Sequence, residues 1–83
     1  MTNKLFRTEK HMSREEASQR LKKISEKLGE GKLELKSGEN SVILEPDEQV
    51  EFEIEVEQES DGDMSLEIEV EWSENSREDI EIK

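Results

Sequence analysis

The chain has 83 residues, enough for one small domain. It carries 24 acidic and 12 basic side chains, a net charge of −12, and no cysteine, which excludes a disulfide scaffold, a cysteine-ligated zinc site and a thiol nucleophile. We expect no nucleic-acid partner because this charge repels phosphate, and neither a membrane-spanning helix nor a signal peptide because no apolar run reaches five residues.

The first segment, residues 1–12, contains a weak strand signal from Leu5 to Lys10. Its alternation is ambiguous, because Leu5 and Phe6 are adjacent and neighbouring side chains of a strand face opposite sides. His11 is the single histidine. Without a cysteine or a second imidazole it cannot form a usual zinc site, so we expect it to face solvent.

A helix is predicted over residues 14–28. Ser13 is followed three residues later by Glu16, the pattern of a capping box. Gly29 stands where a left-handed residue ends many helices. Apolar side chains recur at helical spacing and form one stripe, which consists of Ala17, Leu21, Ile24 and Leu28.

After Gly31 the apolar period changes from the helical value to two, which predicts strands. A short hairpin is expected between residues 33 and 44, with its turn at 37–40. Pro46 then interrupts the ladder because proline has no N–H to donate.

Two long strands follow, at residues 50–57 and 64–72, in which apolar residues alternate with glutamate or serine. The loop between them contains Asp61-Gly62-Asp63, which turn chemistry explains better than calcium binding because the spacing of an EF-hand is missing. Residues 73–83 are expected to be an acidic tail, in which residues 79–82 add a short edge strand or fray.

These elements predict an α+β fold in the order β-α-β-β-β-β. The sheet of four to five antiparallel strands has one apolar face and the helix has one apolar stripe, so we expect the two to form a two-layer sandwich. Residues 1–72 would be a single domain whose core includes Phe52, Ile68 and Trp72.

Several of these motifs together resemble one known family. They are Met12 to Ala17, Leu33 to Leu35, Glu45 to Asp47, Glu51 to Val56 and the strand Leu66 to Trp72. The chain resembles the amphi-Trp domain family over residues 4–72, with the tail outside the pattern. The resemblance implies a small acidic archaeal or bacterial protein of unestablished function, and it transfers no catalytic or binding residue.

The alternation of the long strands places glutamates together on one sheet face. We expect this face to be a solvated surface, a docking site for a basic protein partner, a divalent-cation site or, on charge density alone, a mimic of a nucleic-acid surface. Trp72 is expected to close the core or to anchor a partner. The candidate interaction residues are Glu51, Glu53, Glu55, Glu57, Glu67, Glu69, Glu71 and Trp72.

Charge is divided along the chain, because residues 1–36 are net basic and residues 37–83 strongly acidic. The helix therefore offers a basic surface that could contact an acidic patch of another copy, or that is simply solvated. No catalytic, cofactor or metal motif is present. We expect a cytoplasmic, non-enzymatic interaction or accessory module that binds a basic partner or self-associates through a sheet edge, with divalent-cation binding as the alternative.

Overall fold

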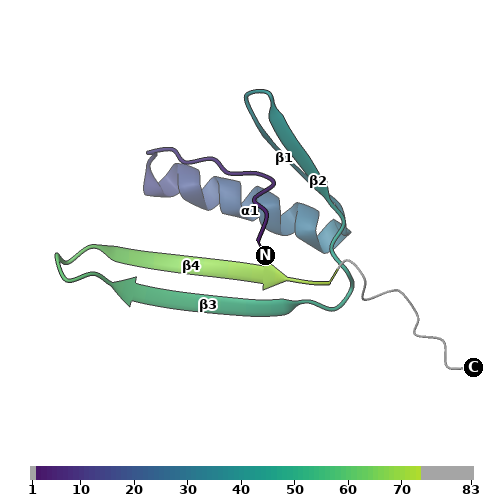
Figure 1. The fold of residues 1–83 in the computed structure, drawn as a ribbon. Helices are drawn as coiled ribbons and strands as arrows, with labels where there is room; N and C mark the ends of the chain where they lie inside the picture. Colours follow the sequence, from purple (N-terminus) through teal and green to yellow (C-terminus); the bar gives the residue numbers. More distant parts are fainter. Residues whose placement is uncertain (1, 74–83) are drawn as a thin grey trace, which may run out of the picture. The chain divides into compact units, whose positions relative to one another are not determined.

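The computed structural model describes residues 2–73 of the chain (Figure 1). The chain divides into two compact units, Met1–Pro46 and Asp47–Lys83, and each is described by itself. One helix and four strands lie within the described residues, so the predicted α+β class is confirmed. In chain order they are α1 (Arg14–Glu30), β1 (Leu33–Ser37), β2 (Asn40–Leu44), β3 (Glu51–Gln58) and β4 (Met64–Glu71).

Helix α1 begins where the capping pattern places it. Ser13 has extended backbone angles, and its hydroxyl oxygen accepts the N–H of Glu16 at 3.0 Å. The helix ends at Glu30, two residues later than predicted, because Gly31 and not Gly29 adopts the left-handed conformation, with φ of 90°. The N–H of Gly31 then donates to a carbonyl of the last turn.

The first unit pairs β1 with β2 as an antiparallel hairpin, which confirms the predicted one. Leu33 faces Leu44 and Leu35 faces Val42, so the inward side chains of both strands share one face. Helix α1 packs against β1, and Leu33 is 7% exposed. Leu33 and Pro46 are the buried residues of the described chain.

Residues 2–13 run alongside α1 without helix or strand structure (Figure 1), so the strand expected from Leu5 to Lys10 is not confirmed. Within the described chain, the Ser37 hydroxyl donates to the Thr8 hydroxyl at 3.1 Å, and no backbone ladder joins this segment to β1. A segment whose two apolar residues face opposite sides has no single face to bury.

The second unit contains the hairpin β3–β4, paired antiparallel in the register that its alternation predicts. Apolar residues face one another across the strands on one side of the hairpin, and glutamates do so on the other. The apolar pairs are Phe52 with Val70, Ile54 with Ile68 and Val56 with Leu66.

The loop between β3 and β4 is closed by hydrogen bonds within the loop, which confirms it as a turn. The N–H of Glu59 donates to the Asp63 carbonyl at 2.8 Å, and the N–H of Gly62 donates to the Glu59 carbonyl at 2.9 Å. A carboxylate oxygen of Asp61 accepts the N–H of Asp63 at 2.9 Å. The aspartates therefore shape the turn.

Two expectations about the sheet differ from the structure. The described strands form two separate two-stranded sheets in place of one sheet of four or five, because Pro46 and the loop after it interrupt the ladder between β2 and β3. Phe52 and Ile68 are 63% and 47% exposed, since two strands cannot cover their own apolar face. The edge strand expected at residues 79–82 lies outside the described residues.

Candidate functional site

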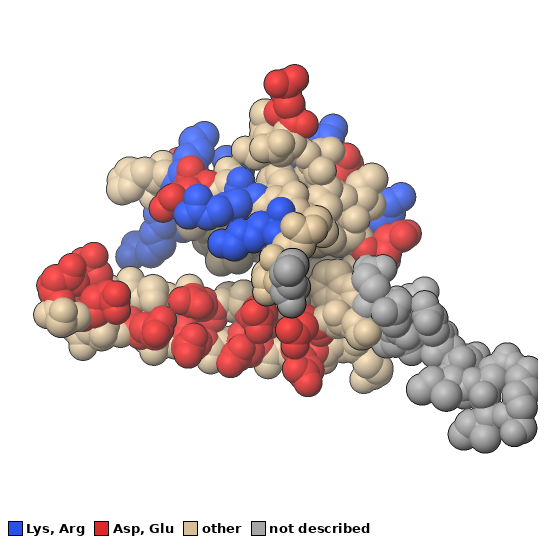
Figure 2. All heavy atoms as spheres, in the orientation of Figure 1, with Lys and Arg blue, Asp and Glu red and all other residues tan. Residues whose placement is uncertain are grey.

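The glutamate face of the hairpin β3–β4 carries a dense row of negative charge. The register sets three pairs of glutamates opposite one another, Glu51 with Glu71, Glu53 with Glu69 and Glu55 with Glu67. Glu57 stands opposite Ser65 and completes the set of seven predicted carboxylates. All seven are exposed, and Figure 2 shows the acidic side chains in a row along the hairpin.

This glutamate face has no basic side chain of its own hairpin to balance it. Between residues 47 and 76 the sequence contains no lysine, arginine or histidine, and no ion pair joins any of the seven carboxylates to another described residue. Like charges directly opposite on two strands destabilise a hairpin. The arrangement therefore favours cations that come from solution or from a partner.

The neighbouring carboxylates raise the pKa of two members of the glutamate face, Glu67 and Glu69. Glu57 and then Glu55 raise the pKa of Glu67 above its usual value of 4.5, mainly by their negative charge. A hydrogen bond to Glu53, followed by the charge of the same residue, raises the pKa of Glu69. Both groups are fully exposed, so solvent screens these interactions.

Three carboxylates near the turn end of the hairpin lie close enough to share a cation. One ligand oxygen from each of Glu55, Glu57 and Glu67 lies within 4.8 Å of the others. Calcium takes six to eight oxygen ligands, so this trio would leave most of the coordination sphere to water. The geometry permits a weak, exposed contact with a divalent cation.

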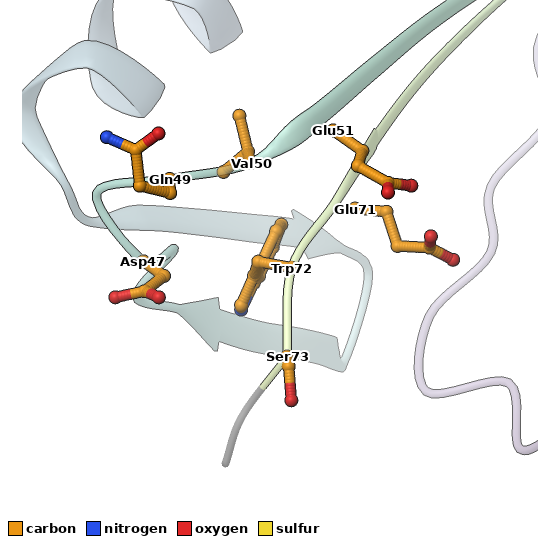
Figure 3. Close-up of a pocket in the computed structure, with 7 residues that line it drawn as sticks. All are labelled: Asp47, Gln49, Val50, Glu51, Glu71, Trp72 and Ser73. Atoms are coloured by element: carbon orange, nitrogen blue, oxygen red, sulfur yellow. The ribbon is translucent and has the colours of Figure 1, made fainter. Parts of the chain in front are cut away.

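A cavity of about 600 Å³ lies at the other, open end of the same hairpin (Figure 3). In this view the indole of Trp72 stands at the centre, with the Asp47 carboxylate on one side and the carboxylates of Glu51 and Glu71 together on the other. We call this the Trp72 pocket. Its lining consists of Asp47, Gln49, Val50, Glu51, Glu71, Trp72 and Ser73.

The Trp72 pocket forms because two distant segments converge. If the register of β3–β4 continues by one residue, Trp72 lies opposite Val50 on the apolar side of the hairpin. The neighbouring pair, Glu51 and Glu71, lies on the acidic side. The partly exposed indole and two members of the glutamate face line the same cavity, from opposite sides of the hairpin. The other five predicted glutamates lie along the strands, away from this cavity.

Four lining residues of the pocket were missed by sequence reasoning, and they are Asp47, Gln49, Val50 and Ser73. Three of them follow Pro46, whose turn signal predicts an interruption of the ladder but not the path of the loop. The register could have found Val50 alone, since it ends with Glu51 opposite Glu71 and so brings Val50 next to Trp72.

A second cavity, of about 450 Å³, lies within the first unit. Its basic lining residues are Arg20, Lys23 and Lys27 of α1 and Lys36 of β1. Lys27 lies 3.6 Å from Glu30 and Lys36 lies 3.9 Å from Glu34, so part of this basic charge is balanced locally. Its apolar lining consists of Phe6, Ile24, Leu33 and Leu35.

Neither cavity contains the residues of a recognisable catalytic site. His11 is exposed and lines neither of them. Within residues 2–73, no helix is both long enough and apolar enough to cross a membrane.

Comparison with known proteins identifies one family. Searches of curated proteins and of solved structures gave no match. The family model of the Amphi-Trp domain matches residues 1–83, which confirms the resemblance and shows that the tail, expected outside the pattern, lies within the match. The chain therefore belongs to the Amphi-Trp domain family.

Proposed function

We propose that this protein is a non-enzymatic interaction module whose glutamate face binds a basic surface of a partner protein. The single observation that carries the proposal is the run of three glutamate pairs, exposed and without a basic residue in their own hairpin. A basic partner relieves this repulsion on binding, and the long-range attraction accelerates association. The acidic composition suits a salt-rich cytoplasm, where we place the protein.

We also propose the two-layer arrangement that the sequence predicts, in which the apolar stripe of α1 covers the apolar face of β3–β4. Leu21 of the stripe is 51% exposed and Ile54 of the hairpin is 58% exposed. Apolar surface of this extent on both elements favours mutual burial. This packing would leave the glutamate face outward, which is the orientation that partner binding requires.

The test of partner binding uses a fluorescein-labelled peptide of eight lysines and the full chain, followed by fluorescence anisotropy. We expect saturable binding that weakens as salt rises. The triple variant Glu53→Gln, Glu55→Gln and Glu67→Gln should weaken binding by roughly tenfold or more, because it removes carboxylates from three neighbouring positions of the face.

The matched control removes the same charge from the first unit, as Glu26→Gln, Glu39→Gln and Glu45→Gln. All three of these residues are exposed and outside the glutamate face. The control variant should bind within about threefold of the parent. Equal losses in the two variants would show that the peptide senses only net charge, and absence of binding to the parent would overturn the proposal.

Divalent-cation binding is the alternative function, and the proximity of Glu55, Glu57 and Glu67 is the observation in its favour. Calcium or magnesium titration, followed by NMR of the backbone amides of residues 51–57 and 65–71, separates the two. Saturable shifts confined to the trio at micromolar cation would support a site. Weak, uniform shifts that follow ionic strength would support screening.

The sequence also predicts that the protein self-associates through a sheet edge. Each described strand has one hydrogen-bonded neighbour, so each hairpin presents two edges within residues 2–73. Unpaired edges accept an added strand readily. Sedimentation velocity over a hundredfold range of concentration tests this, and a constant monomer mass would exclude it.

A further inference from the structure

We propose that the cavity between α1, β1 and the segment before the helix binds a small amphipathic anion, in which a carboxylate or phosphate group ends an apolar chain. This cavity of about 450 Å³ lies within the first unit, and we call it the α1–β1 pocket. Its volume falls in the range of roughly 300–1,000 Å³ that small-molecule sites occupy. The pocket is independent of the glutamate face, which belongs to the second unit.

One face of α1 sets three cations beside an apolar side chain. These residues stand at the helical spacing i, i+3, i+4 and i+7, and they are Arg20, Lys23, Ile24 and Lys27. Residues at this spacing share one side of a helix, and all four line the pocket. Figure 2 shows basic side chains gathered around α1. The cations and the isoleucine therefore reach the same space from a single element.

The opposite wall of the pocket is apolar. Leu33 and Leu35 alternate along β1 and so point to the same side of the strand, the side on which Leu33 is buried. Half-buried Phe6 adds an aromatic ring from the segment before the helix. The hydrogen bond of 3.1 Å between the hydroxyls of Ser37 and Thr8 joins that segment to the end of β1. An apolar chain of a ligand can therefore lie between these side chains and the helix.

Two of the three helix cations have no counter-ion. Within residues 2–73, neither Arg20 nor Lys23 takes part in an ion pair or a side-chain hydrogen bond. Glu34 and Lys36 line the pocket from the other face of β1 and balance each other at 3.9 Å. A bound anion would therefore meet positive charge that is not neutralised, and a guanidinium can bind a carboxylate or a phosphate through two N–H groups.

The pocket and the proposed cover by β3–β4 use different sides of α1. Ile24 is the member of the apolar stripe that lines the pocket, and Ala17, Leu21 and Leu28 do not line it. Successive helical residues are rotated by roughly 100°, so the three cations are centred about a quarter turn away from the middle of the stripe. A ligand in the pocket therefore leaves most of the stripe available to the hairpin.

Selectivity for an anion is the distinctive consequence, because the chain as a whole repels anions. The net charge of −12 attracts cations at long range. Octanoate and octylammonium have similar chains and opposite charges, so net charge favours octylammonium and the pocket favours octanoate. 1-Octanol has the chain without a charge, and acetate has the charge without the chain.

The experiment titrates the isotopically labelled full chain with each compound, below micelle formation and at fixed ionic strength. NMR follows the methyl signals of Ile24, Leu33 and Leu35. We expect saturable shifts with octanoate and dissociation constants at least about tenfold higher for octylammonium and 1-octanol, and no saturable shift with acetate. Octyl phosphate is the second anion, and the tighter of the two anions identifies the headgroup.

Two double variants of α1 with the same change of charge separate the pocket from the general basicity of the helix. Arg20→Gln with Lys23→Gln should weaken binding of the anion by roughly tenfold, because it removes the two unpaired cations. Arg14→Gln with Lys22→Gln alters two exposed residues of the same helix outside the pocket and should weaken it by less than about threefold. Circular dichroism verifies that both variants fold.

The apolar part of the pocket is tested by Phe6→Ala, with Leu5→Ala as the control. Phe6 lines the pocket, whereas its neighbour Leu5 is 70% exposed and does not. Both lie in a segment without helix or strand structure. Phe6→Ala should weaken binding of the anion by roughly fivefold because the apolar chain loses a contact, and Leu5→Ala should change it by less than about twofold.

The outcomes distinguish the α1–β1 pocket from the glutamate face. Equal affinity for octanoate, 1-octanol and octylammonium, or equal losses in the two double variants of α1, would overturn the anion site. Absence of saturable shifts with both octanoate and octyl phosphate would do the same, and neither result bears on the binding of a lysine peptide to the second unit. Anion binding that weakens in the Arg20–Lys23 variant and in Phe6→Ala, but not in their controls, would establish the site.

Discussion

Single residues at the ends of elements have clear structural roles in this small chain. Ser13 and Gly31 begin and end α1, one through a hydroxyl that accepts a backbone N–H and the other through a positive φ. Gly38 and Gly62 have positive φ in the two hairpin turns, a conformation that glycine adopts without steric cost. With so few buried side chains between residues 2 and 73, such local terms form a large share of the stability.

The cap at Ser13 gives the prediction at this scale. Ser13→Ala should lower the free energy of unfolding by about 1 kcal/mol, because the N–H of Glu16 loses its acceptor. Ser18→Ala is the control within the same helix, and it should leave stability unchanged or slightly higher since alanine is the better helix former. Urea unfolding measures both, and coincident curves for Ser13→Ala and the parent would refute the cap.

At the scale of elements, the hairpin β3–β4 separates its chemistry onto two faces. The alternation of glutamate with apolar residues forces this separation, because successive side chains of a strand point to opposite sides. The facing glutamates in turn raise the pKa of Glu67 and Glu69 above their usual value. The same pattern that gathers the glutamates on one face therefore weakens the isolated hairpin at neutral pH.

This repulsion predicts how stability depends on pH. A carboxyl whose pKa is higher in the folded state binds protons more readily when the protein is folded. Above that pKa the group is ionised, and its negative charge lowers the free energy of unfolding. The penalty is relieved as the pH falls through the folded pKa towards the unfolded value near 4.5. We therefore expect Glu67 and Glu69 to make the parent relatively more stable near pH 5 than near pH 8.

The measurement is the urea midpoint at both pH values for the parent and for the double variant Glu67→Gln, Glu69→Gln. The variant should lose the part of the pH dependence that these carboxyls cause, and the difference between the two proteins removes the contribution of other titrating groups. Parallel pH profiles for parent and variant would contradict the prediction.

At the scale of the whole molecule, repulsion among the negative charges lowers the stability, and burial of exposed apolar side chains would raise it. The net charge of −12 destabilises a compact chain by self-repulsion. We expect the melting temperature to rise as sodium chloride is increased from low to molar concentration, because salt screens exposed charges. The variant Glu53→Gln, Glu55→Gln, Glu67→Gln should show a smaller rise, and a melting temperature independent of salt would contradict the prediction.

The proposed two-layer packing makes a second prediction at this scale. Ile54 and Ile43 are almost equally exposed within the described chain, at 58% and 56%, and each lies in a hairpin strand. If the apolar face of β3–β4 is covered by α1, Ile54→Ala should cost about 2 kcal/mol or more. Ile43→Ala, opposite Glu34 and outside that face, should cost less than about 1 kcal/mol.

Urea unfolding of the two alanine variants measures these costs. A small and equal cost at both positions would show that the apolar face of the hairpin is not buried in the folded monomer. The salt and packing predictions are independent, since one concerns the acidic face of β3–β4 and the other its apolar face.

Much of the local structure could be predicted because its causes are local. Ser13 and Glu16 indicate where α1 begins, and strict alternation predicts the register of Ile54 with Ile68. Gly29 and Gly31 are both possible ends of the helix from the sequence, and the positive φ of Gly31 with its hydrogen bond to the last turn distinguishes it in the structure. The candidate site was predicted for its carboxylates but not for its cavity.

Sequence alone determined the helix, the two hairpins and the division of β3–β4 into an acidic and an apolar face, because each follows from side-chain period and turn chemistry over short distances. Tertiary structure decided that the strands form two sheets and that residues 47–51 meet residues 71–73 around Trp72. These features depend on how the loop after Pro46 returns to the end of β4. The register brings Val50 next to Trp72, but no local pattern encodes the path of residues 47–49, because it closes a loop between segments far apart in the chain.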